Sequence, residues 1–276
     1  MTHAETEPGP AGAGRVPVIA VASGKGGVGK TTVAVNLALA LRSRGLTVGL
    51  VDADLYGPDA AHMLGLRRRE SASHLTLFAA RGTAGARLEV ARQHGLQIAS
   101  AAFLIGESQG LGVHGEVAQL LVRRLIADAA WEDLDCMVVD LPPGSADVQQ
   151  FVFALAGRAV HVLLVVTPQV VAHRDAHRLL AELERHRAPV AGGVANMASL
   201  TCPDCGASTD LFVPAPPEES IWTRVPLLAS IPFSARAAHD ADNGLPVLVT
   251  RAVAEQVRAY ESLAARIAGL LGPDGS

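Results

Sequence analysis

The chain has 276 residues, of which 49% are hydrophobic, 18% charged and 4% aromatic, and its formal net charge at pH 7 is −4. This composition is typical of a soluble α/β enzyme with an aliphatic core, and it excludes a fibrous or largely disordered chain. The slightly negative charge gives no global attraction to nucleic acid or to anionic lipid, so we expect neither as a partner.

The first fifteen residues are rich in Pro, Gly, Ala and Glu. They lack the basic start and the apolar segment of a secretory signal, so we expect residues 1–15 to form a disordered tail and the protein to be cytoplasmic. Every apolar run is interrupted before it reaches the ~20 residues that a membrane span requires, which predicts no membrane contact.

Short apolar runs alternate with helical spacings along the rest of the chain. The predicted strands are residues 16–23, 47–51, 135–140, 160–166, 190–194 and 227–231. The predicted helices are residues 31–44, 59–64, 116–130, 148–155, 170–187 and 253–271. The pattern weakens between residues 67 and 112, where 88–91 and 97–104 are candidate strands of a hairpin. Strands that alternate with helices predict a three-layer α/β/α sandwich around a mostly parallel sheet.

A glycine-rich string, GKGGVGKTT, lies between the first predicted strand and the first predicted helix. It satisfies G-x-x-x-x-G-K-[ST] in the strand, loop and helix context that makes this motif specific. In such a loop the backbone N–H groups surround phosphate oxygens, Lys30 neutralises the β- and γ-phosphates, and the Thr31 hydroxyl ligates Mg²⁺. The residues expected to bind ATP here are Gly24, Lys25, Gly26, Gly27, Val28, Gly29, Lys30, Thr31 and Thr32. The loop predicts that residues 16–272 form a P-loop ATPase domain with the P-loop NTPase fold.

Lys25 and Lys30 are the only lysines in the chain. A phosphate loop with this second lysine resembles the deviant loop of the MinD/ParA/NifH superclass of ATPases. In that superclass the additional lysine reaches the nucleotide of a partner subunit, so the resemblance implies an ATP-dependent homodimer in which Lys25 has a catalytic role. The alternative is that Lys25 is a solvated loop charge.

Acidic side chains follow two predicted strands. Asp140 ends the strand before Pro142-Pro143-Gly144, the position of a catalytic carboxylate that would hold the Mg²⁺ shell. Residues 142–147, which follow it, would form a switch that senses the γ-phosphate. Asp52 and Asp54 close a neighbouring strand, and the resemblance implies that Asp54 activates water and that Asp52 supports Mg²⁺. Turn formation or helix capping remains the alternative for both.

Asn196 follows the predicted strand 190–194. The resemblance to the superclass implies that its amide binds the adenine edge of the nucleotide. An amide that caps a loop is the alternative.

Two of the three cysteines, Cys202 and Cys205, form the motif CPDC within residues 200–206, on an irregular segment between strands. Their spacing suits zinc or an iron–sulfur cluster, but such a site takes four ligands, so a twofold dimer would have to supply the second pair. Cys136 lies inside a predicted strand and is expected to be a buried, inert thiol. A redox pair and a turn with two structural thiols are the alternatives for CPDC.

Five segments, in chain order, resemble the Mrp/ApbC iron–sulfur cluster carrier ATPases: DADLYGPDAAHMLG, VVDLPPGSADVQ, VVTPQVVAHRDAHR, NMASLTCPDCG and VPLLASIPFS. The resemblance covers about residues 16–249. It implies a homodimer that bridges a labile [4Fe–4S] cluster through Cys202 and Cys205 of each subunit and transfers it, with ATP turnover, to apo iron–sulfur proteins. The chain departs from the family at PPGSAD, where PPGTGD is usual, and at residues 211–217, where a glycine-rich run is usual.

Two other functions compete with cluster transfer. A MinD- or ParA-like positioning or partitioning ATPase would require a basic amphipathic C-terminal tail or an arginine patch for DNA. Residues 264–276 carry Arg266 as their single basic residue, and the arginine run 67–69 is short, so neither feature is evident. A dimeric ATPase held together by zinc, without cluster transfer, is the third possibility, and elemental analysis separates zinc from iron.

Overall fold

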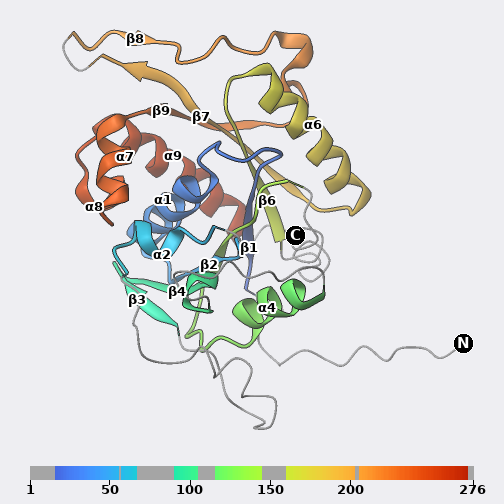
Figure 1. Cartoon of the computed structure of the whole chain (residues 1–276), viewed down its shortest axis with the longest axis vertical. Helices are drawn as coiled ribbons and strands as arrows, with labels where there is room; N and C mark the ends of the chain where they lie inside the picture. Colours follow the sequence, from blue (N-terminus) through green and yellow to red (C-terminus); the bar gives the residue numbers. More distant parts are fainter. Residues whose placement is uncertain are drawn as a thin grey trace, which may run out of the picture.

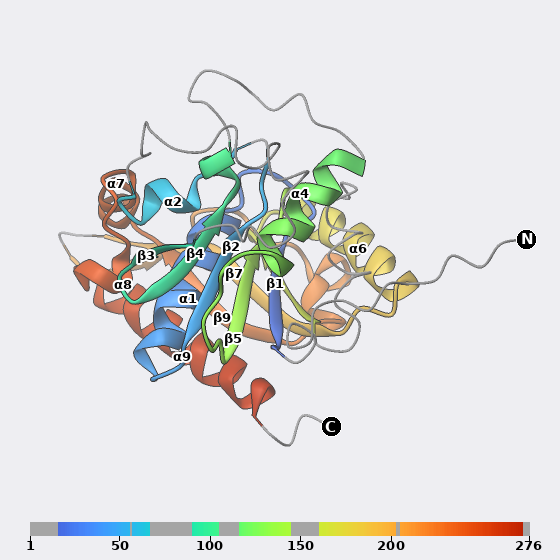
Figure 2. The same cartoon turned by 90° about the horizontal axis from the view of Figure 1, so that it is seen from below.

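The computed structural model of the chain describes residues 16–55, 57–66, 90–104, 116–144, 160–202 and 205–272. Within these ranges a central sheet is covered by helices on both faces, which confirms the predicted α/β/α sandwich (Figures 1 and 2). Four predicted features lie outside the described residues: the tail 1–15, the arginine run 67–69, the switch residues 145–147 and the helix 148–155.

The centre of the sheet consists of parallel strands. They are β1 (Val18–Ala22), β2 (Val48–Asp52), β4 (Leu96–Ser100), β5 (Cys136–Asp140), β6 (Val160–Val166), β7 (Val190–Thr201) and β9 (Leu227–Phe233). Two short antiparallel strands, β3 (Ala91–Gln93) and β8 (Ser208–Thr209), pair with β4 and β7. The order is β3-β4-β2-β5-β1-β6-β7-β8, and β9 also pairs with β7. Since β1 lies between β5 and β6, the loop that follows it opens at the middle of the sheet.

Helices α1 and α9 cover one face of the sheet, and α4 and α6 cover the other (Figure 2). The helices are α1 (Lys30–Ser43), α2 (Ala60–Met63), α4 (Glu116–Ala127), α6 (Val170–Arg185), α7 (Ala235–Asp242), α8 (Val247–Thr250) and α9 (Ala254–Leu271), with 3₁₀ turns η1 (Ala101–Leu104), η3 (Pro217–Glu219) and η4 (Ile221–Thr223).

Strand β1 contributes to the core on both faces, because successive side chains of a strand point to opposite sides. Ile19 and Val21 pack with α1 and α9, whereas Ala20 and Ala22 pack with α4 and α6. All four side chains are fully buried. The core therefore holds the end of β1 rigidly, and with it the start of the loop that leads into α1.

Most predicted segments agree with the structure to within a few residues at their ends. The main difference is β7, which was expected to end at residue 194 and continues to Thr201, because its second half pairs with β8 and β9. A hairpin is present as β3 and β4, but β3 spans Ala91–Gln93 and shares a single residue with the candidate strand 88–91. Strand β4 stops at Ser100, and the 3₁₀ turn η1 follows. Among the described helices, none combines the length and the apolar character needed to cross a membrane.

Candidate nucleotide site and cysteine hairpin

The phosphate loop joins β1 to α1 and packs closely against α6. Gly27 and Gly29 have positive φ angles of 76° and 81°, which glycine adopts without the strain that a side chain would bring. A Cβ atom at Gly24 would lie 2.4 Å from the carbonyl oxygen of Asp175 in α6. Helix α1 begins at Lys30, so its first N–H groups and the positive end of its dipole face the loop. This is the geometry of an anion site.

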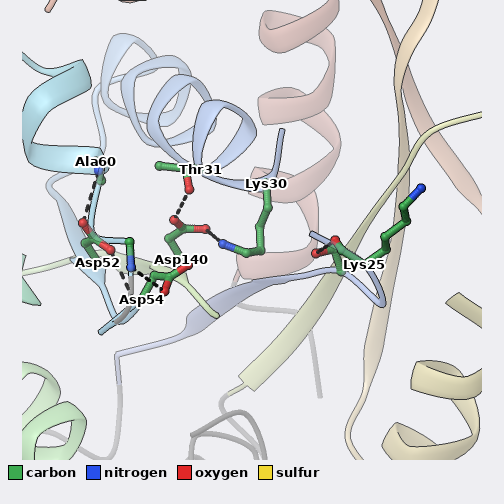
Figure 3. Close-up of polar contacts among 9 residues, drawn as sticks. Lys25, Lys30, Thr31, Asp52, Asp54, Ala60 and Asp140 are labelled. Carbon is green, nitrogen blue, oxygen red and sulfur yellow. Dashed lines mark hydrogen bonds and ion pairs between the residues drawn. The ribbon is translucent and has the colours of Figure 1, made fainter. Parts of the chain in front are cut away.

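Asp140, at the end of β5, joins the loop lysine and the loop threonine (Figure 3). Lys30 Nζ donates to Asp140 Oδ1 at 2.7 Å, and Thr31 Oγ1 donates to Asp140 Oδ2 at 2.6 Å. Asp140 is fully buried and Lys30 is 6% exposed. Burial raises the pKa of Asp140, while the charge of Lys30 opposes this shift. A hydroxyl and a carboxylate side by side are oxygen ligands of the kind that Mg²⁺ prefers, so Thr31 and Asp140 fit a magnesium ion beside the phosphates.

Asp52 lies next to Asp140, because the two residues are partners in the parallel register of β2 and β5. Its Oδ2 accepts hydrogen bonds from Ser100 Oγ at 2.9 Å and from the Ala60 N–H at 3.2 Å, and its Oδ1 accepts one from the Asp54 N–H at 3.3 Å. Burial, followed by the charge of Asp140, raises the pKa of Asp52 well above 3.8. Asp52 thus organises the turn after β2; direct support of magnesium stays a prediction.

The same turn places Asp54 close to Asp140, at the edge of the sheet where the phosphate loop opens (Figure 3). Asp54 is 9% exposed, and its Oδ1 accepts a hydrogen bond from the Gly57 N–H at 3.2 Å. Ser100 is a site residue that the sequence did not reveal. It reaches Asp52 because β4 pairs with β2 and places the two residues opposite each other. The site therefore draws on four neighbouring strands.

Lys25 does not join this cluster. Its side chain is half-buried and points away from Lys30 and Asp140 (Figure 3). Its carbonyl oxygen accepts a hydrogen bond from Ser23 Oγ at 2.9 Å, which helps to fix the backbone of the loop. The ammonium group is thus directed away from the chain's own phosphate site, and its action on a partner's nucleotide stays a prediction.

Asn196, in the middle of β7, contacts the backbone of the phosphate loop. It is 6% exposed, and its Nδ2 donates to the carbonyl oxygen of Val28 at 2.8 Å. A Cβ atom at Gly29 would lie 2.3 Å from this nitrogen. The next residue, Met197, has a positive φ of 53°, at the irregularity where the pairing of β7 with β9 shifts. Asn196 therefore links β7 to the loop, and its contact with adenine stays a prediction.

The cysteine motif occupies a β-hairpin between β7 and β8, at one end of the long axis of the molecule (Figure 1). The Cys202 N–H donates to Ala207 O, and the Gly206 N–H donates to Cys202 O, both at 2.9 Å. Cys202 is half-buried and Cys205 is exposed. Cys136 is buried inside β5, as predicted, and burial raises the pKa of its thiol to about 12.

The described residues of one chain do not assemble a complete metal site around this hairpin. No group of three or more His, Cys, Asp or Glu side chains in these ranges is arranged to hold an ion. The pair Cys202 and Cys205 consequently needs ligands from elsewhere if it is to bind a metal.

A strand, a glycine loop and a helix at the centre of a parallel sheet, with Lys30, Thr31 and Asp140 joined, define a P-loop NTPase. The model of the ParA family described as NUBPL iron-transfer P-loop NTPase matches residues 16–268. The chain belongs to this family, which confirms both resemblances seen in the sequence.

Relatives with known names agree with this assignment. The chain is 36% identical over 269 residues to an iron–sulfur cluster carrier protein of Deinococcus radiodurans, over 98% of this chain and 73% of that protein. It is 37% identical over 254 residues to an iron–sulfur cluster carrier protein of Synechocystis, over 91% of this chain and 70% of that one.

Two solved structures are also similar. A nucleotide-binding protein of Archaeoglobus fulgidus in complex with ADP has 29% identity and a TM-score of 0.64, over 83% of this chain and 86% of that one. The cell division ATPase MinD of Pyrococcus furiosus has 23% identity and a TM-score of 0.66, over 92% of this chain and 99% of that one. At this level of identity the similarity shows a shared fold and nothing more.

Proposed function

We propose that this protein is an ATP-dependent iron–sulfur cluster carrier. It forms a homodimer in the cytoplasm, binds and hydrolyses ATP with magnesium, and transfers a [4Fe–4S] cluster, held by Cys202 and Cys205 of both subunits, to apo iron–sulfur proteins. The observation that carries the proposal is that one strand serves both sites: β7 contacts the phosphate loop through Asn196 and ends immediately before Cys202.

The hydrolytic half of the proposal rests on the buried cluster at the centre of the sheet. Lys30 holds the β- and γ-phosphates, and Thr31 and Asp140 hold magnesium, which when bound neutralises charge on the phosphate oxygens. Asp54 orients a water molecule for attack on the γ-phosphorus. The bond from that phosphorus to the β–γ bridging oxygen breaks, and ADP and phosphate leave. Lys25 of each subunit stabilises the phosphates bound by the other, so hydrolysis depends on dimerisation.

The cysteine half of the proposal rests on ligand number and exposure. One chain offers two thiolates in its hairpin, and a twofold axis doubles them to the four that a [4Fe–4S] cluster takes. Cys205 is exposed and Cys202 half-buried, so the cargo lies at the surface, where an acceptor's thiolates can replace them one at a time. The names of the relatives from Deinococcus radiodurans and Synechocystis support iron–sulfur cargo.

Anaerobic reconstitution with iron and sulfide tests the cargo. The wild type is expected to retain about four irons and four sulfides per dimer, with the absorption band of the cluster in the visible range. Cys202→Ala/Cys205→Ala should lose both, whereas Cys136→Ala, which removes the buried thiol alone, should retain them. Equal retention by the wild type and the double variant would overturn the carrier function.

The same preparations separate the two competing functions. If the isolated protein contains zinc bound by the two thiolates of each chain and does not transfer a cluster to an apo-ferredoxin, the zinc-held dimer is favoured. Steeply salt-dependent binding to DNA would favour a ParA-like role. The proposal predicts that ATP accelerates transfer of the cluster and that Lys30→Ala prevents this transfer.

A further inference from the structure

The cysteine hairpin has little structure of its own to hold it in place. Strand β8 has two residues, and the ladder between β7 and β8 contains the pairs Leu200–Thr209 and Thr201–Ser208. Two-stranded hairpins of this size are at best marginally stable in water. Residues 205–210 are all exposed, so the core does not pack against them. The direction in which the cysteines point therefore depends on contacts at the base of the hairpin.

One such contact joins the base of the hairpin to helix α9. Thr201 Oγ1, in the residue that directly precedes Cys202, donates to Glu255 Oε2 at 2.9 Å. Glu255 lies in the first turn of α9, where the helix dipole interacts favourably with an acidic side chain. A hydroxyl that donates to a charged carboxylate forms a stronger hydrogen bond than a neutral pair does.

Helix α9 is in turn fixed to the helix of the phosphate loop. Tyr260 is 1% exposed and its side chain is hydrogen-bonded to Asn36, which lies in α1. Asn36 Oδ1 also accepts the Leu248 N–H at 3.2 Å, and Gln256 Nε2 donates to Pro232 O of β9 at 2.8 Å. The N-terminal part of α9 is consequently held on two sides, by α1 and by β9, which fixes the backbone that carries the exposed side chain of Glu255.

The geometry points to Thr201 and Glu255 as a positioning pair that fixes the cysteine hairpin on the ATPase core. Two connections from the phosphate loop meet at this pair. Strand β7 contacts the loop through Asn196 and leads to Thr201, and helix α9, which carries Glu255, packs on α1. The inference rests on the proposed function, because it assigns these residues to the cluster site. Positioning matters there, since two hairpins must meet across a twofold axis with errors well below 1 Å to share four ligands.

The first test needs no cluster. In the metal-free full-length protein, hydrogen exchange of the Cys202 and Gly206 amides is measured by NMR. Both amides donate across the hairpin. Thr201→Val, which keeps the shape and removes the hydroxyl, is expected to accelerate exchange about two- to tenfold, the range that loss of one net hydrogen bond implies. Thr201→Ser should restore the wild-type rate. If Thr201→Val and Thr201→Ser exchange at the same rate, the pair does not position the hairpin.

The second test uses the reconstituted dimer and the rate at which a chelator removes the cluster. Thr201→Val and Glu255→Ala should each lose the cluster about two- to tenfold faster than the wild type, and the double variant no faster than either, because both remove one interaction. Glu261→Ala is the matched control: it removes a carboxylate from the same helix, one paired with Arg251 at 2.9 Å, and should behave as the wild type. Basal ATP turnover should be unchanged in all of these variants.

The two tests separate failure of the inference from failure of the proposed function. If the wild type retains no more iron than Cys202→Ala/Cys205→Ala, the carrier function fails, while the exchange of the hairpin amides still decides whether Thr201 positions them. If the wild type retains its cluster and the effects of Thr201→Val and Glu255→Ala multiply in the double variant, the carrier function stands and the positioning pair is refuted.

Discussion

The contact between Asn196 and the phosphate loop predicts an unequal response of two glycines in that loop. Gly27 and Gly29 have similar left-handed φ angles, 76° and 81°, so alanine carries the same backbone cost of about 1–2 kcal/mol at either position. A Cβ atom at Gly27 meets nothing within 4 Å, whereas one at Gly29 lies 2.3 Å from Asn196 Nδ2. Only Gly29→Ala therefore breaks the hydrogen bond to Val28 O, which adds about 0.5–1.5 kcal/mol.

The expected loss in the free energy of unfolding is about 1–2 kcal/mol for Gly27→Ala and about 1.5–3.5 kcal/mol for Gly29→Ala. In a domain of this size, 1 kcal/mol corresponds to about 2–4 °C in Tm. Thermal and urea unfolding without nucleotide measures both variants. In an Asn196→Ala background the side-chain amide that would clash with the new Cβ atom is absent. Adding Gly29→Ala there should lower the free energy of unfolding by no more than Gly27→Ala does. Equal losses for the two single variants, or an undiminished loss in the Asn196→Ala background, would refute the packing argument.

Three further predictions concern the charged and buried groups. Lys30→Ala should lower ATP turnover about a hundredfold or more, whereas Lys25→Ala should retain nucleotide binding and lose the increase of turnover with protein concentration, both followed by phosphate release. Because the pKa of Asp52 is raised in the folded state, the stability of the metal-free protein should fall as pH rises from 3.8 through that pKa. Ser100→Ala removes a hydrogen bond that lowers this pKa, so urea unfolding should show a loss of about 0.5–1.5 kcal/mol where Asp52 is protonated in the folded protein and a larger loss, about 1.5–3 kcal/mol, at higher pH where it is ionised; an equal loss across the whole pH range would contradict the assignment. Iodoacetamide at pH 8 should leave Cys136 unmodified in the folded protein and modify it after unfolding, as measured by mass spectrometry.

The sequence predicted the parts of the structure that depend on local pattern. The alternation of strands and helices predicted the α/β/α sandwich, and the motif between residues 24 and 32 predicted the position of the phosphate loop between β1 and α1. Asp140 was found from its position at the end of an apolar run, and the structure joins it to Lys30 and Thr31. These features depend on residues close in the chain or on one strand end, so their chemistry is visible without the fold.

The features that the sequence did not reveal depend on pairing between distant strands. Ser100 reaches Asp52 only because β4 lies beside β2 in a fixed register. The second half of β7 lacks a continuous apolar pattern, and its strand conformation comes from pairing with β8 and β9. The bond from Asn196 to Val28 spans 168 positions of sequence. Contacts between residues so far apart in the chain produce no local sequence pattern by which they could be predicted.

The placement of the two lysines has a consequence for chemical modification. Lys30 has a side chain that is 7% exposed and ion-paired, whereas Lys25 is half-buried and points away from Lys30 and Asp140 (Figure 3). Since these are the only lysines, every acylation or crosslink of a lysine side chain in this protein falls within the nucleotide loop. In the proposed homodimer a second subunit covers Lys25, so the reactivity of Lys25 toward a small acylating reagent would report on dimerisation in the unaltered chain.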